Sequence, residues 1–339
     1  MTAMLEIEDL TVQFPWPTGP LRAVDGISIK LDQGDTLGIV GESGSGKSLA
    51  MLALMGLVPY PGQVSARRLA FEGKDLRAVS HAERRALTGK DMAMIFQEPA
   101  TSLNPSFTIG FQIMETLRVH ENMDKKAARR RATELLEQVG IPAPESRLAS
   151  YPHQLSGGMN QRVMIAMAIA CNPKLLIADE PTTALDVTIQ AQILDLLRTL
   201  QQERGMALIL ITHNMGVVAE IARRVIVLYS GQIMEERATA DLFSSPQHPY
   251  TAALLAARPE THAGERLATI PGSVPSLLDR PHGCLFSPRC PYATPRTIEH
   301  RPTLKPCAGG AVACHYPLGD PQREVRIAAD RNVVAEIVR

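Results

Sequence analysis

The sequence has no excess of charge of either sign and no long hydrophobic run. Its 339 residues include 35 Lys and Arg against 35 Asp and Glu, so the formal net charge is zero. Nucleic-acid-binding proteins usually carry a basic excess, and this balance argues against such a partner. Apolar runs such as 49–58 and 206–211 are far shorter than the roughly 20 residues with which a helix spans a bilayer.

A secretory signal and an internal repeat are also missing. The first residues, MTAMLEIEDL, alternate in polarity and carry acidic side chains, which is not the pattern of a signal peptide. We therefore expect a soluble, cytoplasmic protein that reaches a membrane only through a partner. With 45% hydrophobic and 21% charged residues, the composition is that of an ordinary globular protein.

Short apolar segments and amphipathic segments alternate along the first two thirds of the chain. The pattern predicts strands at 36–40, 92–96, 174–178, 207–211 and 225–229, and helices at 47–57, 125–139 and 188–204. Such alternation indicates an α/β fold with a mainly parallel sheet covered by helices on both faces. After the first 243 residues proline becomes frequent and periodicity fades, which predicts a separate, irregular module at 244–320 and a tail at 321–339.

A glycine-rich motif stands between a predicted strand and a predicted helix. GESGSGKS, residues 41–48, matches the phosphate-binding pattern G-x-x-x-x-G-K-S in the context that it requires. Its glycines let backbone N–H groups approach phosphates without interference from a Cβ atom. Lysine is expected to reach the β- and γ-phosphates, and the last serine to offer a hydroxyl to Mg²⁺. This segment, called the phosphate loop below, supplies the candidate nucleotide-binding residues Gly41, Ser43, Gly44, Ser45, Gly46, Lys47 and Ser48.

Polar side chains follow three of the predicted strands. LLIAD ends in Asp179-Glu180, MAMIF is followed by Gln97, and ALILIT by His213. Ligands bind at the carboxyl ends of strands in open α/β sheets. We expect Asp179 to hold Mg²⁺ through water and Glu180 to polarise the attacking water. Gln97 is expected to reach Mg²⁺ or that water, and His213 to contact the γ-phosphate. Adjacent acids are commonly mere solvated surface, but the buried strand and the phosphate loop favour the catalytic interpretation.

LSGGMNQR suggests a second anion site. Ser156, Gly157 and Gly158 precede the apolar segment 162–171, as at a helix N-terminus that holds an anion. The motif is remote in sequence from any strand of its own and cannot easily turn back onto the same nucleotide. We expect it to serve a nucleotide on another molecule, in a head-to-tail pair.

Taken together and in this order, the motifs resemble the ABC-transporter ATPase family over about residues 4–243. They are GESGSGKS, FQEP, LSGGMNQR, LLIADEP, TALD at 183–186 and TH at 212–213. The resemblance implies a P-loop cassette with an antiparallel β part and a helical subdomain at about 98–170, and ATP hydrolysis with Glu180 as general base. Asn214 departs from the Asp that usually follows the switch histidine; its amide can hydrogen-bond but carries no charge.

The family resemblance also implies an ATP sandwich dimer. In it, Ser156, Gly157 and Gly158 would bind the γ-phosphate held by the partner, and Asp186 would lie at the dimer seam. Phe14 would be the aromatic residue under the adenine, with Trp16 as its competitor.

Further stretches resemble the oligopeptide and dipeptide importers, most closely the ATPase subunits of dipeptide permeases. These are FQEPATSLNP, HPYTAALLAARP at 248–259 and GCLFSPRCPYA…ACHYP. This similarity implies a peripheral protein at the cytoplasmic face of the inner membrane, paired with a second, different ATPase. The expected complex also contains two membrane permease subunits and an external substrate-binding protein. One permease subunit would dock its coupling helix on the segment after Gln97.

Other functions stay open at this point. Related ATPases serve importers of nickel or other small cargo. Non-transport ABC ATPases act in DNA repair or translation, but they carry a long coiled-coil insertion or two cassettes in one chain. A metabolic P-loop kinase would leave LSGGM unexplained.

Four of the five cysteines lie in the last sixth of the chain, at Cys284, Cys290, Cys307 and Cys314; the fifth, Cys171, reads as a buried small side chain. A cytosolic location argues against disulfides, and thiolates in a proline-rich segment suit a metal centre that substitutes for a core. The spacing leaves an iron–sulfur cluster, zinc and no metal all open. The family resemblance implies a [4Fe–4S] cluster, although Thr297 stands where the third cysteine usually lies, so that Cys307 would have to replace it.

Overall fold

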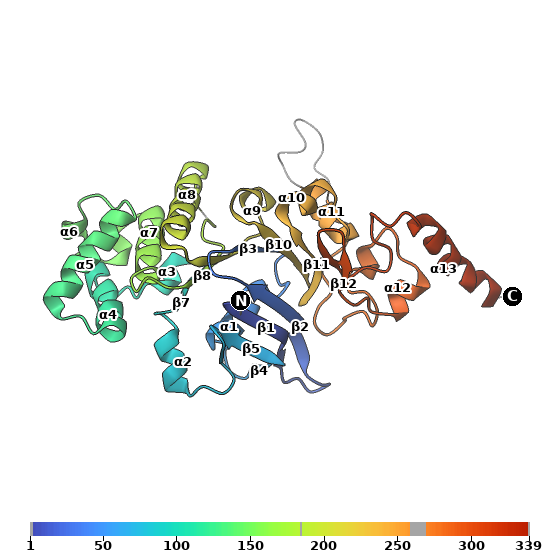
Figure 1. The fold of residues 1–339 in the computed structure, drawn as a ribbon, viewed down its shortest axis with the longest axis horizontal. Helices are drawn as coiled ribbons and strands as arrows, with labels where there is room; N and C mark the ends of the chain where they lie inside the picture. Colours follow the sequence, from blue (N-terminus) through green and yellow to red (C-terminus); the bar gives the residue numbers. More distant parts are fainter. Residues whose placement is uncertain (1–2, 184, 258–268, 338–339) are drawn as a thin grey trace. The chain divides into compact units, whose positions relative to one another are not determined.

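The computed structural model describes residues 3–183, 185–257 and 269–337, and these divide into two compact units (Figure 1). Unit 1 consists mainly of Ala70–Ile211, together with Lys30–Thr36 and the first residues of the chain. Unit 2 consists of Glu6–Ile29, Leu37–Leu69 and the chain from Thr212 onward. Three residues of the motifs quoted above, Ala184, Arg258 and Pro259, lie outside the described residues.

Unit 1 contains three parallel strands, β7 (Met92–Ile95), β8 (Leu175–Asp179) and β9 (Ala207–Ile211). β8 lies between the other two, with Ile177 level with Met94 on one side and with Ile209 on the other. Every residue of the three strands is buried, as expected for parallel strands written as continuous apolar runs. The strands predicted at 92–96, 174–178 and 207–211 are confirmed to within one residue at each end.

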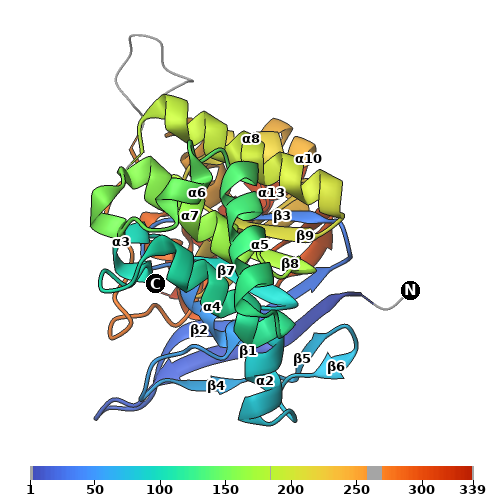
Figure 2. The same cartoon turned by 90° about the vertical axis from the view of Figure 1, so that its left-hand side faces the viewer.

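The helical part of unit 1 lies mostly between β7 and β8. α5 shows why it folds: its apolar residues Ala128, Ala132, Leu135 and Leu136 recur at helical spacing and are all buried. The Asp124 side chain caps it by accepting a hydrogen bond from the Ala127 amide at 2.8 Å. α5 contacts α4, α6 and α7, and α4 also contacts α7 (Figure 2). The elements are β6 (Lys74–Asp75), α2 (His81–Leu87), α3 (Pro99–Ser102), α4 (Ile109–Glu121), α5 (Lys125–Gln138), α6 (Pro144–Arg147), η1 (Pro152–Gln154), α7 (Gly157–Ala168) and α8 (Val187–Arg204).

Unit 2 holds a run of hydrogen-bonded strands in the order β12-β13-β11-β10-β3. β10 pairs with β3 in parallel, and the other neighbours are antiparallel. In a second sheet β1 lies between β2 and β5, and it also pairs with β4 in the antiparallel direction. β1 alternates buried and more exposed residues, as expected for a strand with one face on the core. The strands are β1 (Leu5–Phe14), β2 (Leu21–Leu31), β3 (Thr36–Val40), β4 (Gln63–Ser65), β5 (Arg68–Phe71), β10 (Arg224–Tyr229), β11 (Gln232–Ala238), β12 (Lys305–Cys307) and β13 (Gly310–Val312).

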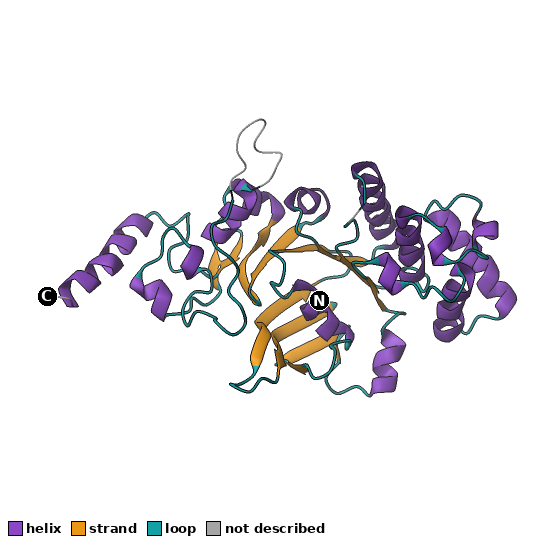
Figure 3. Cartoon of the chain, turned by 180° about the vertical axis from the view of Figure 1, so that it is seen from behind, coloured by secondary structure: helices purple, strands orange, loops and turns teal. Residues whose placement is uncertain are grey.

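Before α13, the C-terminal part of unit 2 is mostly loop with short helices (Figure 3), yet it is well anchored. β13 pairs with β11, and an apolar core that includes Tyr229, Tyr250 and Phe286 lies beneath the loops. The helices of unit 2 are α1 (Lys47–Met55), α9 (Met215–Ile221), α10 (Thr239–Ser244), α11 (Pro249–Ala256), η3 (Ser287–Arg289), α12 (Pro295–Glu299) and α13 (Arg323–Ile337). No helix within the described ranges is both long and apolar enough to cross a membrane.

Candidate functional site

The phosphate loop makes a tight turn between β3 and α1. Gly41 has φ +150°, and a Cβ atom there would lie 2.1 Å from the Leu228 carbonyl oxygen. Gly46 has φ +96°, and its Cβ would lie 2.8 Å from the Ala23 carbonyl oxygen. Side chains are therefore excluded at both ends of the loop, and its backbone is free to face a ligand. Gly46 also provides no capping side chain for α1, the arrangement in which a helix N-terminus offers its N–H groups to an anion.

Lys47 is the first residue of α1 and is buried, with 6% of its surface exposed. Its ammonium group folds back over the loop: Nζ donates to the carbonyl oxygens of Gly41 at 2.8 Å and Glu42 at 3.0 Å, and to Ser45 Oγ at 3.3 Å. The loop thus holds a positive charge at its centre, which suits the binding of phosphate groups.

In unit 1, Gln97 and Glu180 come together although they lie 83 residues apart in sequence. Gln97 Nε2 donates to Glu180 Oε2 at 3.1 Å, and Thr183 Oγ1 donates to the same oxygen at 2.9 Å. The buried Asp179 is the last residue of β8, level with Ile211 of β9. The sequence placed Gln97, Asp179 and Glu180 at strand ends. Thr183 is the first residue of the TALD motif, but the sequence did not indicate its contact with Glu180.

Glu180 has a strained backbone. Its φ is +46°, in the left-handed region that costs a non-glycine residue about 1 kcal/mol or more. Its amide N–H donates to the Ile211 carbonyl oxygen at 2.9 Å, which holds the turn in place. Strain of this kind is typical of functional positions, because the surrounding structure must fix it.

His213 follows Thr212 in unit 2 and is exposed. The Thr212 amide donates to the Ile39 carbonyl oxygen at 3.2 Å, which fixes His213 just beyond the end of β3. Asn214 is the N-cap of α9: its Oδ1 accepts hydrogen bonds from the amides of Gly216 at 2.8 Å and Val217 at 3.4 Å. The replacement of the usual Asp by Asn therefore keeps the acceptor that the helix needs.

Asn214→Ala is expected to lower the free energy of unfolding by about 1 kcal/mol, because two amide donors of α9 lose their acceptor. Asn214→Asp serves as the matched control and is expected to keep the stability, since a carboxylate accepts the same bonds and favours a helix N-terminus. Urea unfolding measures both. An equal loss in the free energy of unfolding in the two variants would show that Asn214 does not stabilise the protein by capping α9.

Ser156 is the N-cap of α7, and its Oγ accepts a hydrogen bond from the Met159 amide at 3.3 Å. Ser156 and Gly157 are exposed, and a Cβ atom at Gly157 would meet no atom within 4 Å. A Cβ at Gly158, in contrast, would lie 3.0 Å from Ile189 of α8. Asp186 caps α8 by accepting a bond from the Ile189 amide at 2.9 Å and is exposed too. The two helix N-termini therefore lie close together at the surface of unit 1.

The two aromatic candidates for the adenine lie near the end of β1. Phe14 is the last residue of the strand and is half-buried beside Gly62. Trp16 is 50% exposed.

The four late cysteines, predicted as metal ligands, lie in the C-terminal part of unit 2 and are not joined by disulfides. Among the described residues, no group of three or more His, Cys, Asp or Glu side chains could hold a metal ion. Burial raises the pKa of the Cys284 thiol to about 11 and that of the Cys314 thiol to about 12. Thr297 is buried beside Cys284, whose amide donates to the Thr297 carbonyl oxygen at 2.8 Å. Cys307 lies in β12. Burial raises the pKa of its thiol, the charge of Arg237 lowers it and the charge of Glu235 raises it.

Comparisons with known proteins agree with this description. A family model described as ABC transporter matches residues 24–183, and one described as Oligopeptide/dipeptide transporter, C-terminal region, matches residues 234–296. The Dipeptide transport ATP-binding protein DppD of Escherichia coli (strain K12) is 58% identical over 323 residues, which cover 95% of this chain and 99% of that protein. The Oligopeptide transport ATP-binding protein OppD of Bacillus subtilis (strain 168) is 51% identical over 90% of this chain and 86% of its own length.

Among solved structures, the ATP-binding cassette MJ0796, a dimer in a post-hydrolysis state bound to ADP and Pi, matches with a TM-score of 0.62 and 28% sequence identity. The match covers 70% of this chain and 99% of that cassette. The predicted P-loop cassette fold is therefore confirmed.

Proposed function

The chain belongs to the ABC transporter family as an ATP-hydrolysing cassette, and from that premise we propose that it powers the import of dipeptides or other short peptides through partner membrane subunits. One observation carries this proposal: the similarity to a dipeptide transport ATP-binding protein extends over 95% of the chain. It includes the C-terminal region, residues 234–296, that matches oligopeptide and dipeptide transporters. A cassette that shared only the nucleotide-binding part would not match there.

We further propose that the phosphate loop binds ATP and that the strand-end residues take part in its hydrolysis. The phosphates would lie against the loop amides, with Lys47 between them. The candidate Mg²⁺ ligands, Ser48, Gln97 and Asp179, all offer oxygen atoms, the ligand type that Mg²⁺ prefers. This set therefore fits the ion. When bound, Mg²⁺ would neutralise phosphate charge. Glu180 would accept the proton of the attacking water, while Gln97 and Thr183 hold its carboxylate by the hydrogen bonds described above. His213 would contact the γ-phosphate, and Phe14 the adenine.

A second cassette would complete the site. We propose that Ser156, Gly157 and Gly158 of one molecule donate to the γ-phosphate bound by the other, with Asp186 at the seam. The exposed N-terminus of α7 and the open space at Gly157 support this arrangement, as does the likeness to a dimeric cassette. We propose a second, different ABC ATPase subunit as the natural partner.

The remaining partners follow from the family. The ATPase would lie at the cytoplasmic face of the inner membrane, bound to two permease subunits, with a substrate-binding protein on the outer side. No feature of the chain calls for a nucleic acid.

It stays a prediction that four cysteines bind a [4Fe–4S] cluster or zinc. They are Cys284, Cys290, Cys307 and Cys314. Iron, zinc and sulfide analysis of protein purified without oxygen tests it, together with the visible absorbance of a cluster. Metal-free protein of full ATPase activity would contradict it.

The proposed cargo is tested in liposomes that contain the permease subunits found to co-purify with this chain. ATP hydrolysis and uptake of labelled dipeptide are expected to rise together when a peptide-loaded binding protein is added. Stimulation by nickel instead of peptides, or co-purification with soluble repair or translation proteins in place of permeases, would overturn the proposal.

A further inference from the structure

The phosphate loop contains an acid. Glu42 is its second residue, and its carbonyl oxygen lies 3.0 Å from Lys47 Nζ. The carboxylate of the same residue is part of the loop, and without a compensating charge it would repel a triphosphate that the loop receives. The loop therefore needs a device that removes the charge of Glu42.

Arg289 provides such a device from the C-terminal part of unit 2. Its Nη1 lies 2.6 Å from Glu42 Oε2 and its Nη2 lies 3.0 Å from Glu42 Oε1, a two-pronged pairing. The arginine side chain is only 3% exposed, against 28% for the acid. Hydrogen bonding to Glu42 raises the pKa of Arg289 above its ordinary value, so the guanidinium charge is always present.

The guanidinium group is fixed from several sides. Nε donates to the Pro271 carbonyl oxygen at 2.8 Å, and Nη1 donates to the Tyr229 hydroxyl at 3.3 Å. The group also lies 5.8 Å from the ring centre of Tyr229 and 6.0 Å from that of Phe286. An arginine held in this way approaches Glu42 in one geometry and loses little freedom in the pairing.

A second contact reaches the main chain of the loop. The hydroxyl of the fully buried Tyr250 accepts a hydrogen bond from the Glu42 amide at 2.9 Å. Tyr250 packs against Tyr229 and Phe286, with ring centres 4.7 Å and 5.2 Å apart. Its own segment is tied to β11, because the buried Glu235 accepts the amides of Gln247 and His248, each at 2.8 Å.

We propose that Arg289 and Tyr250 are positioning residues for the phosphate loop, and that Arg289 cancels the charge of Glu42 so that the loop can receive the triphosphate of ATP. The C-terminal segment is thereby a working part of the nucleotide site. This inference rests on the proposed function of the loop. The competing explanation is that the ion pair only anchors the segment.

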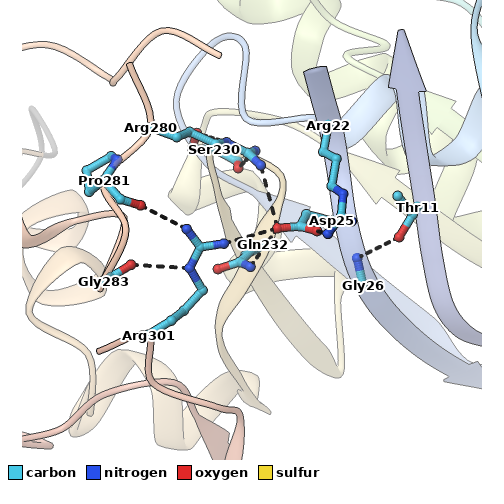
Figure 4. A network of polar contacts seen from close by, with 10 residues as sticks. All are labelled: Thr11, Arg22, Asp25, Gly26, Ser230, Gln232, Arg280, Pro281, Gly283 and Arg301. Carbon is cyan, nitrogen blue, oxygen red and sulfur yellow. Dashed lines mark hydrogen bonds and ion pairs between the residues drawn. The ribbon is translucent and has the colours of Figure 1, made fainter. Parts of the chain in front are cut away.

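A second ion-pair cluster in unit 2 supplies the matched control. Asp25 of β2 lies between Arg301 at 3.2 Å and Arg280 at 3.6 Å, two arginines of the same C-terminal segment (Figure 4). Arg301 also donates to the Pro281 carbonyl oxygen at 2.8 Å. Arg301→Ala therefore removes an anchoring arginine without touching Glu42.

The test measures KM and kcat for ATP hydrolysis by the full chain. Arg289→Ala is expected to raise KM about tenfold or more with a much smaller change in kcat, because a charge-assisted pair is lost and the carboxylate is exposed to the ligand. Arg289→Ala combined with Glu42→Gln is expected to recover most of that loss. Arg289→Lys keeps the charge but not the paired bonds, so its KM is expected to lie between those of the wild type and Arg289→Ala. Arg301→Ala is expected to leave KM within about twofold of the wild-type value.

Two results would overturn the inference: an unchanged KM in Arg289→Ala, or an increase that Glu42→Gln does not relieve and that Arg301→Ala reproduces. If Arg289→Ala does not fold, Arg289→Lys with and without Glu42→Gln gives the same comparison. A wild-type chain that fails to hydrolyse ATP even in complex with its partner ATPase subunit would instead contradict the proposed function itself, so the two failures are distinct.

Discussion

Replacing Glu180 with Gln is expected to lower kcat for ATP hydrolysis by about 10²- to 10⁴-fold, the contribution of a positioned general base. Gln has nearly the same shape, and its amide oxygen can still accept the hydrogen bond from Thr183 that Glu180 accepts at 2.9 Å. The variant loses the ability to take up the proton of the attacking water. ATP binding is expected to persist, so that two cassettes remain closed around unhydrolysed nucleotide.

Steady-state hydrolysis, nucleotide retention and size-exclusion chromatography measure these effects. Glu203→Gln, a change at an exposed acid near the end of α8, is the matched control and is expected to keep the wild-type rate. A Glu180→Gln variant that hydrolyses ATP as fast as the wild type would remove Glu180 from the role of base.

Lys47→Ala is expected to weaken ATP binding by about 100-fold or more, because the phosphates lose a charge-assisted donor at the centre of the loop. The change also removes the hydrogen bonds that the Lys47 ammonium group donates to the carbonyl oxygens of Gly41 and Glu42. Calorimetry or displacement of a fluorescent nucleotide measures the Kd. Lys126→Ala, at an exposed position of α5, is expected to leave it unchanged. A Kd within about threefold of the wild-type value in Lys47→Ala would contradict the assignment.

Local patterns in the sequence predicted much of the fold. The buried strands β7, β8 and β9 are short apolar runs, and α5 has both an apolar face and an acidic cap, so each carries its own signal. Gln97 and Glu180 were predicted at strand ends, and their contact follows because β7 and β8 are neighbours in a parallel sheet.

Contacts made by irregular segments left no such signal. Arg289 and Glu42 are 247 residues apart, and neither belongs to a periodic pattern. The prediction of a metal centre assumed that the C-terminal segment lacks a core of its own. Instead, Phe286 packs with Tyr229 and Tyr250 in a buried cluster, an arrangement visible only once the distant segments are folded together. The predicted domain limits at residues 243 and 320 stay predictions.

The central claim is that α7 of one molecule completes the ATP site of another, and mixing two inactive variants tests it most directly. Lys47→Ala disables the phosphate loop. Gly157→Glu puts a negative charge in open space at the start of α7, where it suits the helix but repels phosphate. A mixed dimer contains one site that is intact on both sides, so an equal mixture is expected to recover about a quarter of the wild-type activity. A mixture that stays inactive although the two variants associate, or a Gly157→Glu variant that is fully active by itself, would contradict the account.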